Sequence, residues 1–113
     1  MPPHIRIEPA ARPYRVEVGG VTLASGAPAM ELYEGGRGPT IYVDRAGIDM
    51  TLLEKTDRTT SCPHKGQASY YSKRTPQGVL ANAVWSYETP TGDAGTIAGH
   101  LAFYTDRVSL TQV

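Results

Sequence analysis

Glycine and proline divide this chain of 113 residues into short segments, and that division constrains the fold more than any other feature. The 12 glycines and 9 prolines stand between runs rich in valine, isoleucine, tyrosine and threonine. This spacing is typical of β-rich domains, because glycine and proline form turns while the residues of the runs favour strands. The sequence predicts a mainly β fold, a single small domain of about seven to nine short antiparallel strands in a sandwich or partly closed barrel. At most one or two short helical turns are expected.

The clearest predicted element is a hairpin, YRVEVGGVTL, centred on the Gly19-Gly20 pair. Apolar and charged residues alternate before the two glycines, which can adopt the positive φ angles of a two-residue turn. In the predicted register Val18 opposes Val21, and Val16 opposes Leu23. The apolar residues of both strands then share the face that points toward the core.

Further strands are expected where apolar residues recur with a period of two. They lie at Met30–Tyr33, Ile41–Val43, Ala68–Arg74 and Val79–Tyr87, with two short ones around Leu101–Phe103 and Val108–Leu110. The segment Met50–Glu54 is too short for its periodicity to separate a helical turn from a strand, so it stays open. Residues 1–12 are expected to form a poorly ordered N-terminal segment, and residues 13–113 the single β-rich domain.

Composition excludes several classes of partner. Eleven lysines and arginines balance eleven aspartates and glutamates, and the basic residues are scattered, so nucleic acid is not an expected partner. The start MPPHIR lacks the apolar run of a secretory signal, which favours a cytoplasmic location. No segment approaches the roughly 20 apolar residues that span a bilayer, so a membrane is not expected either.

Residues 57–66 read DRTTSCPHKG and are the most chemically dense segment of the chain. One hypothesis makes Cys62 a catalytic nucleophile and His64 its base, since Arg58, His64 and Lys65 are cations of the kind that lower a thiol pKa. In the alternative, Cys62 is a small buried residue beside a turn ordered by proline. Cys62 and His64 supply only two soft metal ligands, so no metal site is expected and no cofactor is assigned.

Anion binding is a second interpretation of the same segment. Arg58 offers a bidentate fork, Lys65 a point charge, and the backbone N–H at Gly66 a close approach to a phosphate or carboxylate. The predicted ligand-binding residues are Asp57, Arg58, Thr60, Lys65, Gly66, Tyr70 and Trp85. In the alternative, Arg58 or Arg107 forms an internal ion pair with a nearby aspartate or glutamate, and the segment is a loop held for structure.

The chain is also rich in aromatic residues, with seven tyrosines, one tryptophan and one phenylalanine. Four tyrosines fall on the strand face opposite the plainly apolar residues: Tyr33, Tyr42, Tyr71 and Tyr104. They could line a wetter surface that stacks a base or sugar ring. In the alternative, they bury their rings as tyrosines in strands commonly do. Trp85 and Tyr87 are expected on the core-facing side of their strand.

Six motifs in this order and spacing closely resemble one family. They are GGV (19–21), LLE (52–54), DRTTSCPHKG (57–66), ASYYS (68–72), AVWSY (83–87) and IAGHLAFYTDRV (97–108). From about Tyr14 onward the chain resembles domain of unknown function family 427, sometimes labelled nucleotidyltransferase-like. The resemblance implies a small, mostly β domain of bacteria and fungi. It brings no catalytic residues, and the chain lacks the glycine-rich loop with paired carboxylates that nucleotidyl transfer needs.

Two functions follow as hypotheses. The first is a protein that binds a small anionic or nucleotide-like ligand at residues 57–66, with the question of catalysis left open. The second is a non-catalytic interaction module, for example a homodimer formed through an exposed strand edge, in which residues 57–66 are structural.

Overall fold

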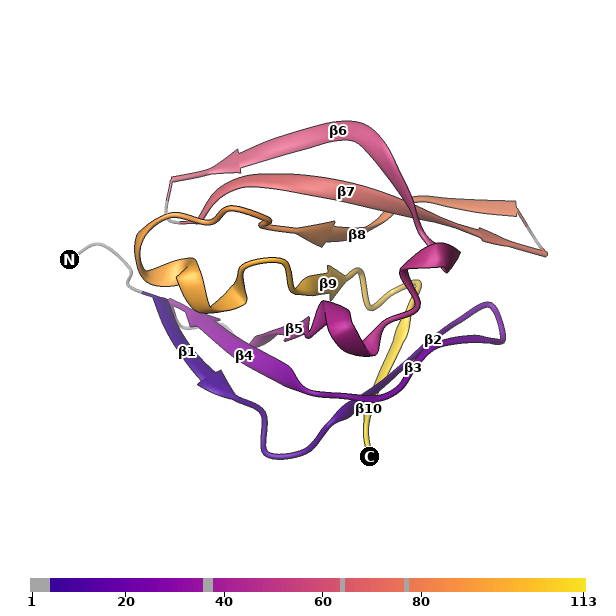
Figure 1. Cartoon of the computed structure of the whole chain (residues 1–113), viewed down its shortest axis with the longest axis horizontal. Coiled ribbons are helices and arrows are strands. Elements are labelled where there is room, and N and C mark those ends of the chain that lie inside the picture. Colours follow the sequence, from indigo (N-terminus) through magenta and orange to yellow (C-terminus); the bar gives the residue numbers. More distant parts are fainter. Residues whose placement is uncertain (1–4, 36–37, 64, 77) are drawn as a thin grey trace.

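The protein folds into two antiparallel β-sheets with three short 3-10 helices, as the computed structural model shows (Figure 1). The structure describes residues 5–35, 38–63, 65–76 and 78–113, apart from the side chains of residues 92 and 93. Ten strands lie within these described ranges, seven in a large sheet and three in a small one. The prediction of a mainly β antiparallel fold is confirmed, and the large sheet is open rather than closed into a barrel.

The large sheet has the strand order β1-β4-β5-β9-β8-β7-β6, and the small sheet the order β10-β2-β3. The strands are β1 (Ile5–Pro9), β2 (Tyr14–Val18), β3 (Val21–Ala27), β4 (Ala29–Glu34), β5 (Thr40–Val43), β6 (Glu54–Cys62), β7 (Gly66–Thr75), β8 (Gly78–Ser86), β9 (Leu101–Phe103) and β10 (Ser109–Gln112). The 3-10 helices are η1 (Arg45–Gly47), η2 (Met50–Leu52) and η3 (Gly92–Ile97). Within the segment 1–12, residues 5–9 form β1, which pairs with β4.

The predicted hairpin is strands β2 and β3, joined by Gly19-Gly20 with φ angles of 55° and 80°. Val18 opposes Val21 as predicted, and Val16 is buried. The predicted pairing of Val16 with Leu23 is wrong, because Val16 opposes Ala24. A β-bulge inserts one extra residue into β3 at this point, so Leu23 and its neighbour are both buried.

The segment Met50–Glu54, whose periodicity did not separate a helical turn from a strand, begins with a 3-10 helix, η2, and continues into β6. The side chain of Asp49 accepts a hydrogen bond from the backbone N–H of Thr51, which satisfies a donor that the first helical turn leaves unpaired. Asp44 caps η1 in the same way, through the backbone N–H of Ala46. Both helical turns therefore begin at an aspartate, and they carry the chain from β5 to β6.

The two faces of the large sheet carry two separate cores. The first core contains residues of both sheets: Val16, Val18, Leu23, Ala24, Ala27, Ala29, Val43, Ile48, Leu53, Tyr71, Ala83, Val84, Leu101, Phe103 and Val108. The second core lies on the opposite face of the large sheet: Leu32, Tyr42, Ala68, Tyr70, Tyr87, Ala94, Ile97 and Ala102. Consecutive residues Tyr42 and Val43 point into different cores, as the alternation of a strand requires. Strand β9 is buried on both faces.

The four tyrosines expected on one wetter surface are divided between the two faces. Tyr71 belongs to the first core, whereas Tyr42 belongs to the second and Tyr104 packs against it. Tyr42 is only 1% exposed. Tyr33 lies elsewhere, under the guanidinium of Arg6. The large sheet is buried on both sides at its centre, so the face opposite an apolar residue is a second interior rather than a surface.

Candidate ligand-binding site

A cavity of about 280 Å³ lies on the second-core face of the large sheet. Its lining combines five aromatic side chains with one cation and one carboxylate. The lining residues are Leu32, Glu34, Gly38, Thr40, Tyr42, Lys65, Tyr70, Trp85, Tyr87 and Tyr104. Strands β4, β5, β7 and β8 all contribute, together with the β6–β7 turn and the segment after β9.

Strand register places the aromatic rings together. Tyr70 of β7 lies directly opposite Trp85 of β8, so both side chains emerge on the same face. On its other side Trp85 opposes Ala102, whose small side chain leaves room above the sheet. The indole ring lies 4.7 Å from the ring of Tyr104 and 6.5 Å, edge to face, from the ring of Tyr42. These contacts hold the rings in fixed positions around the cavity.

Lys65 brings a positive charge into this aromatic cavity. Its ammonium lies 2.9 Å from Glu34 and 5.6 Å from the centre of the Tyr87 ring, and its side chain is 12% exposed. Burial on its own lowers the pKa of Lys65, but the hydrogen bond to Glu34 and the neighbouring Tyr87 and Cys62 raise it overall. Lys65 is therefore a partly buried ammonium at neutral pH rather than an amine nucleophile.

The ion pair also connects two distant strands of the curved, open sheet. Glu34 ends β4, while Lys65 lies in the turn between β6 and β7, and three strands separate β4 from β7 in the sheet order. A direct contact across that width requires the sheet to curl toward the second-core face. Figure 1 shows this curl, with β6 and β7 above and β1 and β4 below η3.

Backbone contacts fix the turn that carries Lys65. The backbone N–H of Lys65 donates to the carbonyl of Cys62, and its carbonyl accepts from the backbone N–H of Thr91. Gly66 follows with a φ angle of 104°, and a Cβ there would lie 3.6 Å from atoms of Thr89 and Thr91. The turn is thus tied to the segment before η3, which positions the ammonium over the cavity.

The hydroxyls of Tyr42 and Tyr87 are neutral at physiological pH. Burial raises the pKa of Tyr42 to about 12, although the hydrogen bond from the indole N–H of Trp85 opposes the increase. Burial likewise raises the pKa of Tyr87 to about 12 against the opposing charge of Lys65. Both hydroxyls can therefore donate or accept a hydrogen bond toward a bound molecule.

Three of the predicted ligand-binding residues line the cavity: Lys65, Tyr70 and Trp85. Two more lie beside them, since the hydroxyl of Thr60 is 2.9 Å from that of Tyr70 and the guanidinium of Arg58 lies 5.0 Å from the centre of the same ring. Gly66 follows Lys65 at the edge of the sheet. Asp57 is exposed on β6 and is not among the lining residues.

The catalytic pair remains a prediction. Cys62 is half-buried against the second core, close enough to the cavity to influence Tyr42 and Lys65 electrostatically. His64 lies outside the described residues, so its distance from Cys62 is not part of the structure. Among the described side chains, no group of three or more histidine, cysteine, aspartate or glutamate residues is placed to hold a metal ion.

Sequence reasoning did not include seven of the ten lining residues among the predicted ligand-binding residues. They are Leu32, Glu34, Gly38, Thr40, Tyr42, Tyr87 and Tyr104, of which only Tyr42 and Tyr104 were considered for a ring-stacking surface. The signal available in the sequence was the alternation of Leu32 with Glu34 and of Thr40 with Tyr42 across two paired strands. The distant pairing of β5 with β9 and of β9 with β8, which brings these residues to the 57–66 segment, has no local signature.

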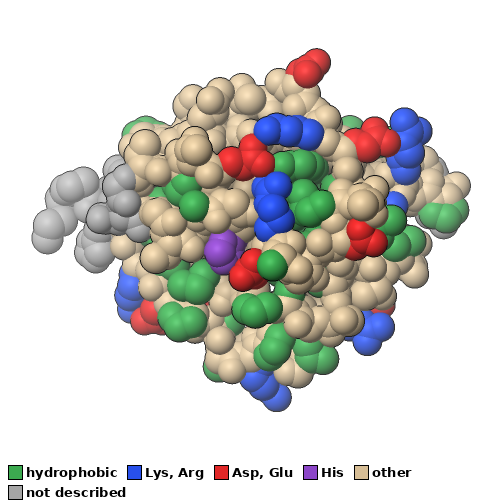
Figure 2. All heavy atoms as spheres, in the orientation of Figure 1, with side chains coloured by type: hydrophobic (Ala, Val, Ile, Leu, Met, Phe, Trp, Pro, Cys, Tyr) green, Lys and Arg blue, Asp and Glu red, His purple; other side chains and the backbone are tan. Residues whose placement is uncertain are grey.

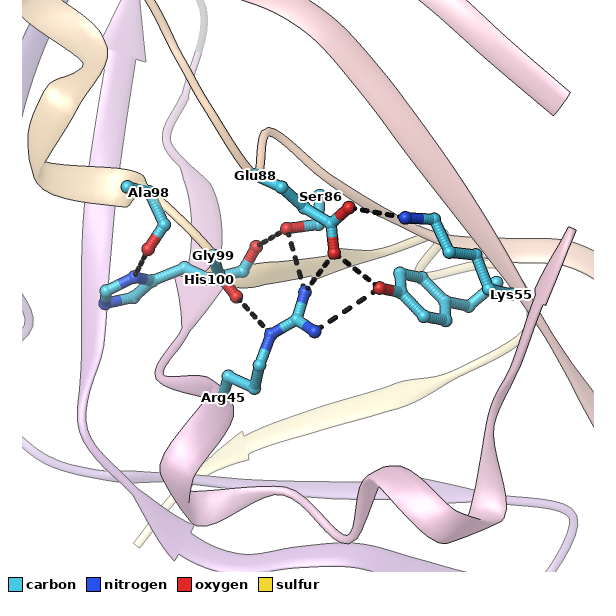
Figure 3. Close-up of polar contacts among 8 residues, drawn as sticks. Arg45, Lys55, Ser86, Glu88, Ala98, Gly99 and His100 are labelled. Carbon is cyan, nitrogen blue, oxygen red and sulfur yellow. Dashed lines mark hydrogen bonds and ion pairs between the residues drawn. The ribbon is translucent and has the colours of Figure 1, made fainter. Parts of the chain in front are cut away.

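A second polar cluster lies on the other face of the large sheet, around Glu88 (Figure 3). One carboxylate oxygen of Glu88 accepts from Arg45 at 2.9 Å and from the Tyr71 hydroxyl at 2.6 Å, and the other accepts from Lys55 at 2.7 Å. Arg45 donates further to the carbonyl of Gly99 and to Ser86. Partial burial alone would raise the pKa of Glu88, but these three donors lower it to about 2. The cluster ties η1, β6, β7 and β8 together.

Charges of both signs lie side by side on the face of the molecule drawn in Figure 2. Figure 2 shows lysine, arginine, aspartate and glutamate side chains interspersed on the face it presents, without a large patch of one sign. This pattern agrees with the formal net charge of zero. No helix among the described residues is long and apolar enough to cross a membrane.

Comparison with known proteins places the chain in a family. No curated protein matches the sequence. One family model, described as "Domain of unknown function (DUF427)", matches residues 6–113. The match covers every strand from β2 to β10, and with them all the residues that line the cavity. The chain therefore belongs to the DUF427 family, as the order and spacing of its motifs indicate.

Proposed function

We propose that this protein binds a small organic anion that carries a planar ring. The ring lies among the aromatic side chains of the cavity, and the anionic group contacts the ammonium of Lys65. The observation that carries the proposal is the convergence of five aromatic rings and one buried lysine on a single cavity. Ligand sites commonly combine an apolar, aromatic lining with a few placed polar groups.

The size and chemistry of the cavity support a ligand of modest dimensions. Its volume of about 280 Å³ lies at the lower end of the range of ligand pockets, roughly 300–1,000 Å³, which suits one ring with short substituents. Trp85 and Tyr104 contribute aromatic surface to the lining, while the neutral hydroxyls of Tyr42 and Tyr87 offer hydrogen bonds.

Lys65 retains capacity for a ligand despite its ion pair. An ammonium has three N–H donors, and Glu34 accounts for one of them. An anion entering the cavity would take a second donor in a partly dehydrated environment, where charge-assisted hydrogen bonds are strong. Glu34, at 30% side-chain exposure, can turn toward water and reduce the repulsion.

Binding is measurable without a label, because Trp85 is the sole tryptophan of the chain and lines the cavity. A panel of ring-bearing carboxylates and phosphates, nucleotides among them, is titrated by tryptophan fluorescence and repeated by thermal shift. A ligand that binds only the folded state raises the melting temperature by mass action. We expect at least one ring-bearing anion to change the fluorescence and raise the melting temperature together.

A matched pair of charge removals tests the role assigned to Lys65. Lys65→Gln is expected to weaken binding by about 1.5–3 kcal/mol, the range for a hydrogen bond to a charged group. Lys55→Gln removes the same charge from the opposite face and is expected to leave affinity unchanged. Equal affinities for both variants and wild type would remove Lys65 from the site.

Indifference of the wild-type protein to every ring compound of the panel would overturn the binding function. The alternative, a non-catalytic interaction module or homodimer in which residues 57–66 are structural, would then be favoured. Sedimentation of the same samples distinguishes a monomer from a homodimer. Cytoplasmic location stays a prediction from the sequence.

A further inference from the structure

Two arginines lie over rings that line the cavity. The guanidinium of Arg58 lies 5.0 Å from the centre of the Tyr70 ring, and that of Arg107 lies 5.3 Å from the centre of the Tyr104 ring. Both rings line the cavity. Burial and the adjacent Tyr70 raise the pKa of Tyr104, and the charges of Arg58 and Arg107 both oppose that increase. Tyr70 pairs with Trp85, and the Trp85 ring lies 4.7 Å from the ring of Tyr104. The two guanidinium groups therefore lie over neighbouring parts of one aromatic cluster, although one comes from β6 and the other from the segment before β10.

These two guanidinium groups form few ion pairs and hydrogen bonds with the described residues of the protein. Arg58 forms no ion pair with any described side chain, and its recorded contact is the face of Tyr70. Arg107 lies 3.9 Å from the exposed carboxylate of Asp106 and donates one N–H to the carbonyl of Ala81. Arg45, by contrast, donates hydrogen bonds to Gly99, Ser86, Tyr71 and Glu88.

Stacking on a tyrosine holds a guanidinium in place while leaving the N–H groups at its edge free. A planar fork held in this way loses little rotamer freedom when it binds, and its geometry matches the oxygens of phosphate. Two such forks near one position favour a group with several acceptor oxygens and more than one negative charge. A phosphate monoester fits this description better than a carboxylate does.

We infer that the cavity takes a ring compound with a phosphate monoester, with the phosphate held by Arg58 and Arg107 at the rim, an assignment that rests on the proposed function. The ring stacks within the cavity, and an acidic group on the ring contacts Lys65 as in the proposed function, so the phosphate at the rim is an additional contact. The ligand class is an aryl or heteroaryl ring joined to a phosphate directly or through a short linker.

Matched pairs of probes separate the ring from the phosphate. The pairs are phenol and phenyl phosphate, uridine and its 5′-monophosphate, and adenosine and its 5′-monophosphate, each titrated by Trp85 fluorescence at two salt concentrations. We expect the phosphorylated member of at least one pair to bind about tenfold or more tightly than its partner. The preference is expected to shrink at higher salt, because exposed charges are screened.

Four variants test which arginines cause the preference for the phosphorylated probes. Arg58→Gln and Arg107→Gln are each expected to reduce affinity for the phosphorylated probe by about three- to tenfold and leave the unphosphorylated probe unaffected. Arg58→Lys, which keeps the charge but not the fork, is expected to fall between Arg58→Gln and wild type. Arg15→Gln, an exposed arginine of the small sheet, is the control and should bind like wild type.

The possible results separate this inference from the function it rests on. Equal binding of both members of every pair, or a phosphate preference that survives in the Arg58→Gln, Arg107→Gln double variant, would overturn the phosphate assignment and leave ring binding intact. A protein that binds neither member of any pair would overturn both.

Discussion

Two polar clusters lie on opposite faces of one sheet and contain similar residues, but one stabilises the fold and the other faces a cavity. Around Glu88, a half-buried carboxylate takes three donors, and Arg45 in turn reaches three further acceptors. Around Lys65, a buried ammonium has one recorded carboxylate partner and faces a cavity. The guanidinium of Arg45 is bound to four acceptors of the protein, so the Glu88 cluster stabilises the fold. An unsaturated cation beside open space is the arrangement that a binding site needs.

The largest effect is expected from Arg45→Ala. This change removes the donor to Gly99 and Ser86 and leaves Glu88 with two of its three partners. Unfolding free energy is expected to fall by about 2–3 kcal/mol, measured by urea denaturation, because several charge-assisted bonds are lost together. Ligand affinity should not change, since Arg45 lies on the other face. A loss below about 0.5 kcal/mol, the range for ordinary surface substitutions, would show that the cluster is not a stabilising anchor.

Acid should weaken the same cluster. The pKa of Glu88 is lowered to about 2 in the folded protein, against about 4.3 for an unfolded glutamate. A group with a depressed folded pKa contributes stability above its unfolded pKa and loses it as the pH falls toward the folded value. The loss between about pH 5 and 2 is expected to be about 1–2 kcal/mol, reduced by the partial exposure of the pair. In Glu88→Gln that portion of the pH dependence should disappear; an unchanged acid profile would contradict the low pKa.

A smaller effect is expected at the cavity when no ligand is present. A double-mutant cycle with Lys65→Gln and Glu34→Gln should give a coupling free energy of about 0.5–1 kcal/mol, because one partner of the pair is partly exposed. Saturating ligand should reduce the coupling, since its anionic group shares the Lys65 ammonium. Coupling that is the same with and without ligand would mean that the ion pair plays no part in binding.

The smallest expected effect concerns the thiol beside the cavity. Cys62 is half-buried and packs against the second core, so its labelling by a thiol reagent at neutral pH should be slow. Bound ligand should slow it by a further few-fold, as about 1 kcal/mol of protection would. Complete labelling within seconds would instead promote the hypothesis of Cys62 as a nucleophile. A His64→Ala variant that reacts more slowly than wild type would support His64 as its base.

The reasoning from sequence succeeded where a signal is local. Alternation and the Gly19-Gly20 turn predicted the β2–β3 hairpin. The bulge that makes Val16 pair with Ala24 was not predicted, because nothing in the sequence marks the inserted residue. The segment 57–66 was recognised as chemically dense, and Lys65 does enter the cavity. The tyrosines were harder to place, because periodicity shows that two faces exist but not that both are buried.

What the sequence determined by itself is the β class, the turn positions, the family and the residue types available for a site. Each depends on neighbours in the chain or on spacing that the chain preserves. Only the tertiary structure decided that Glu34 meets Lys65 and that rings from β5, β7 and β8 surround one space. Those contacts depend on the pairing of β9 between β5 and β8 and on the curl of the large sheet. Both result from the burial of apolar side chains on two faces at once, which no single segment encodes.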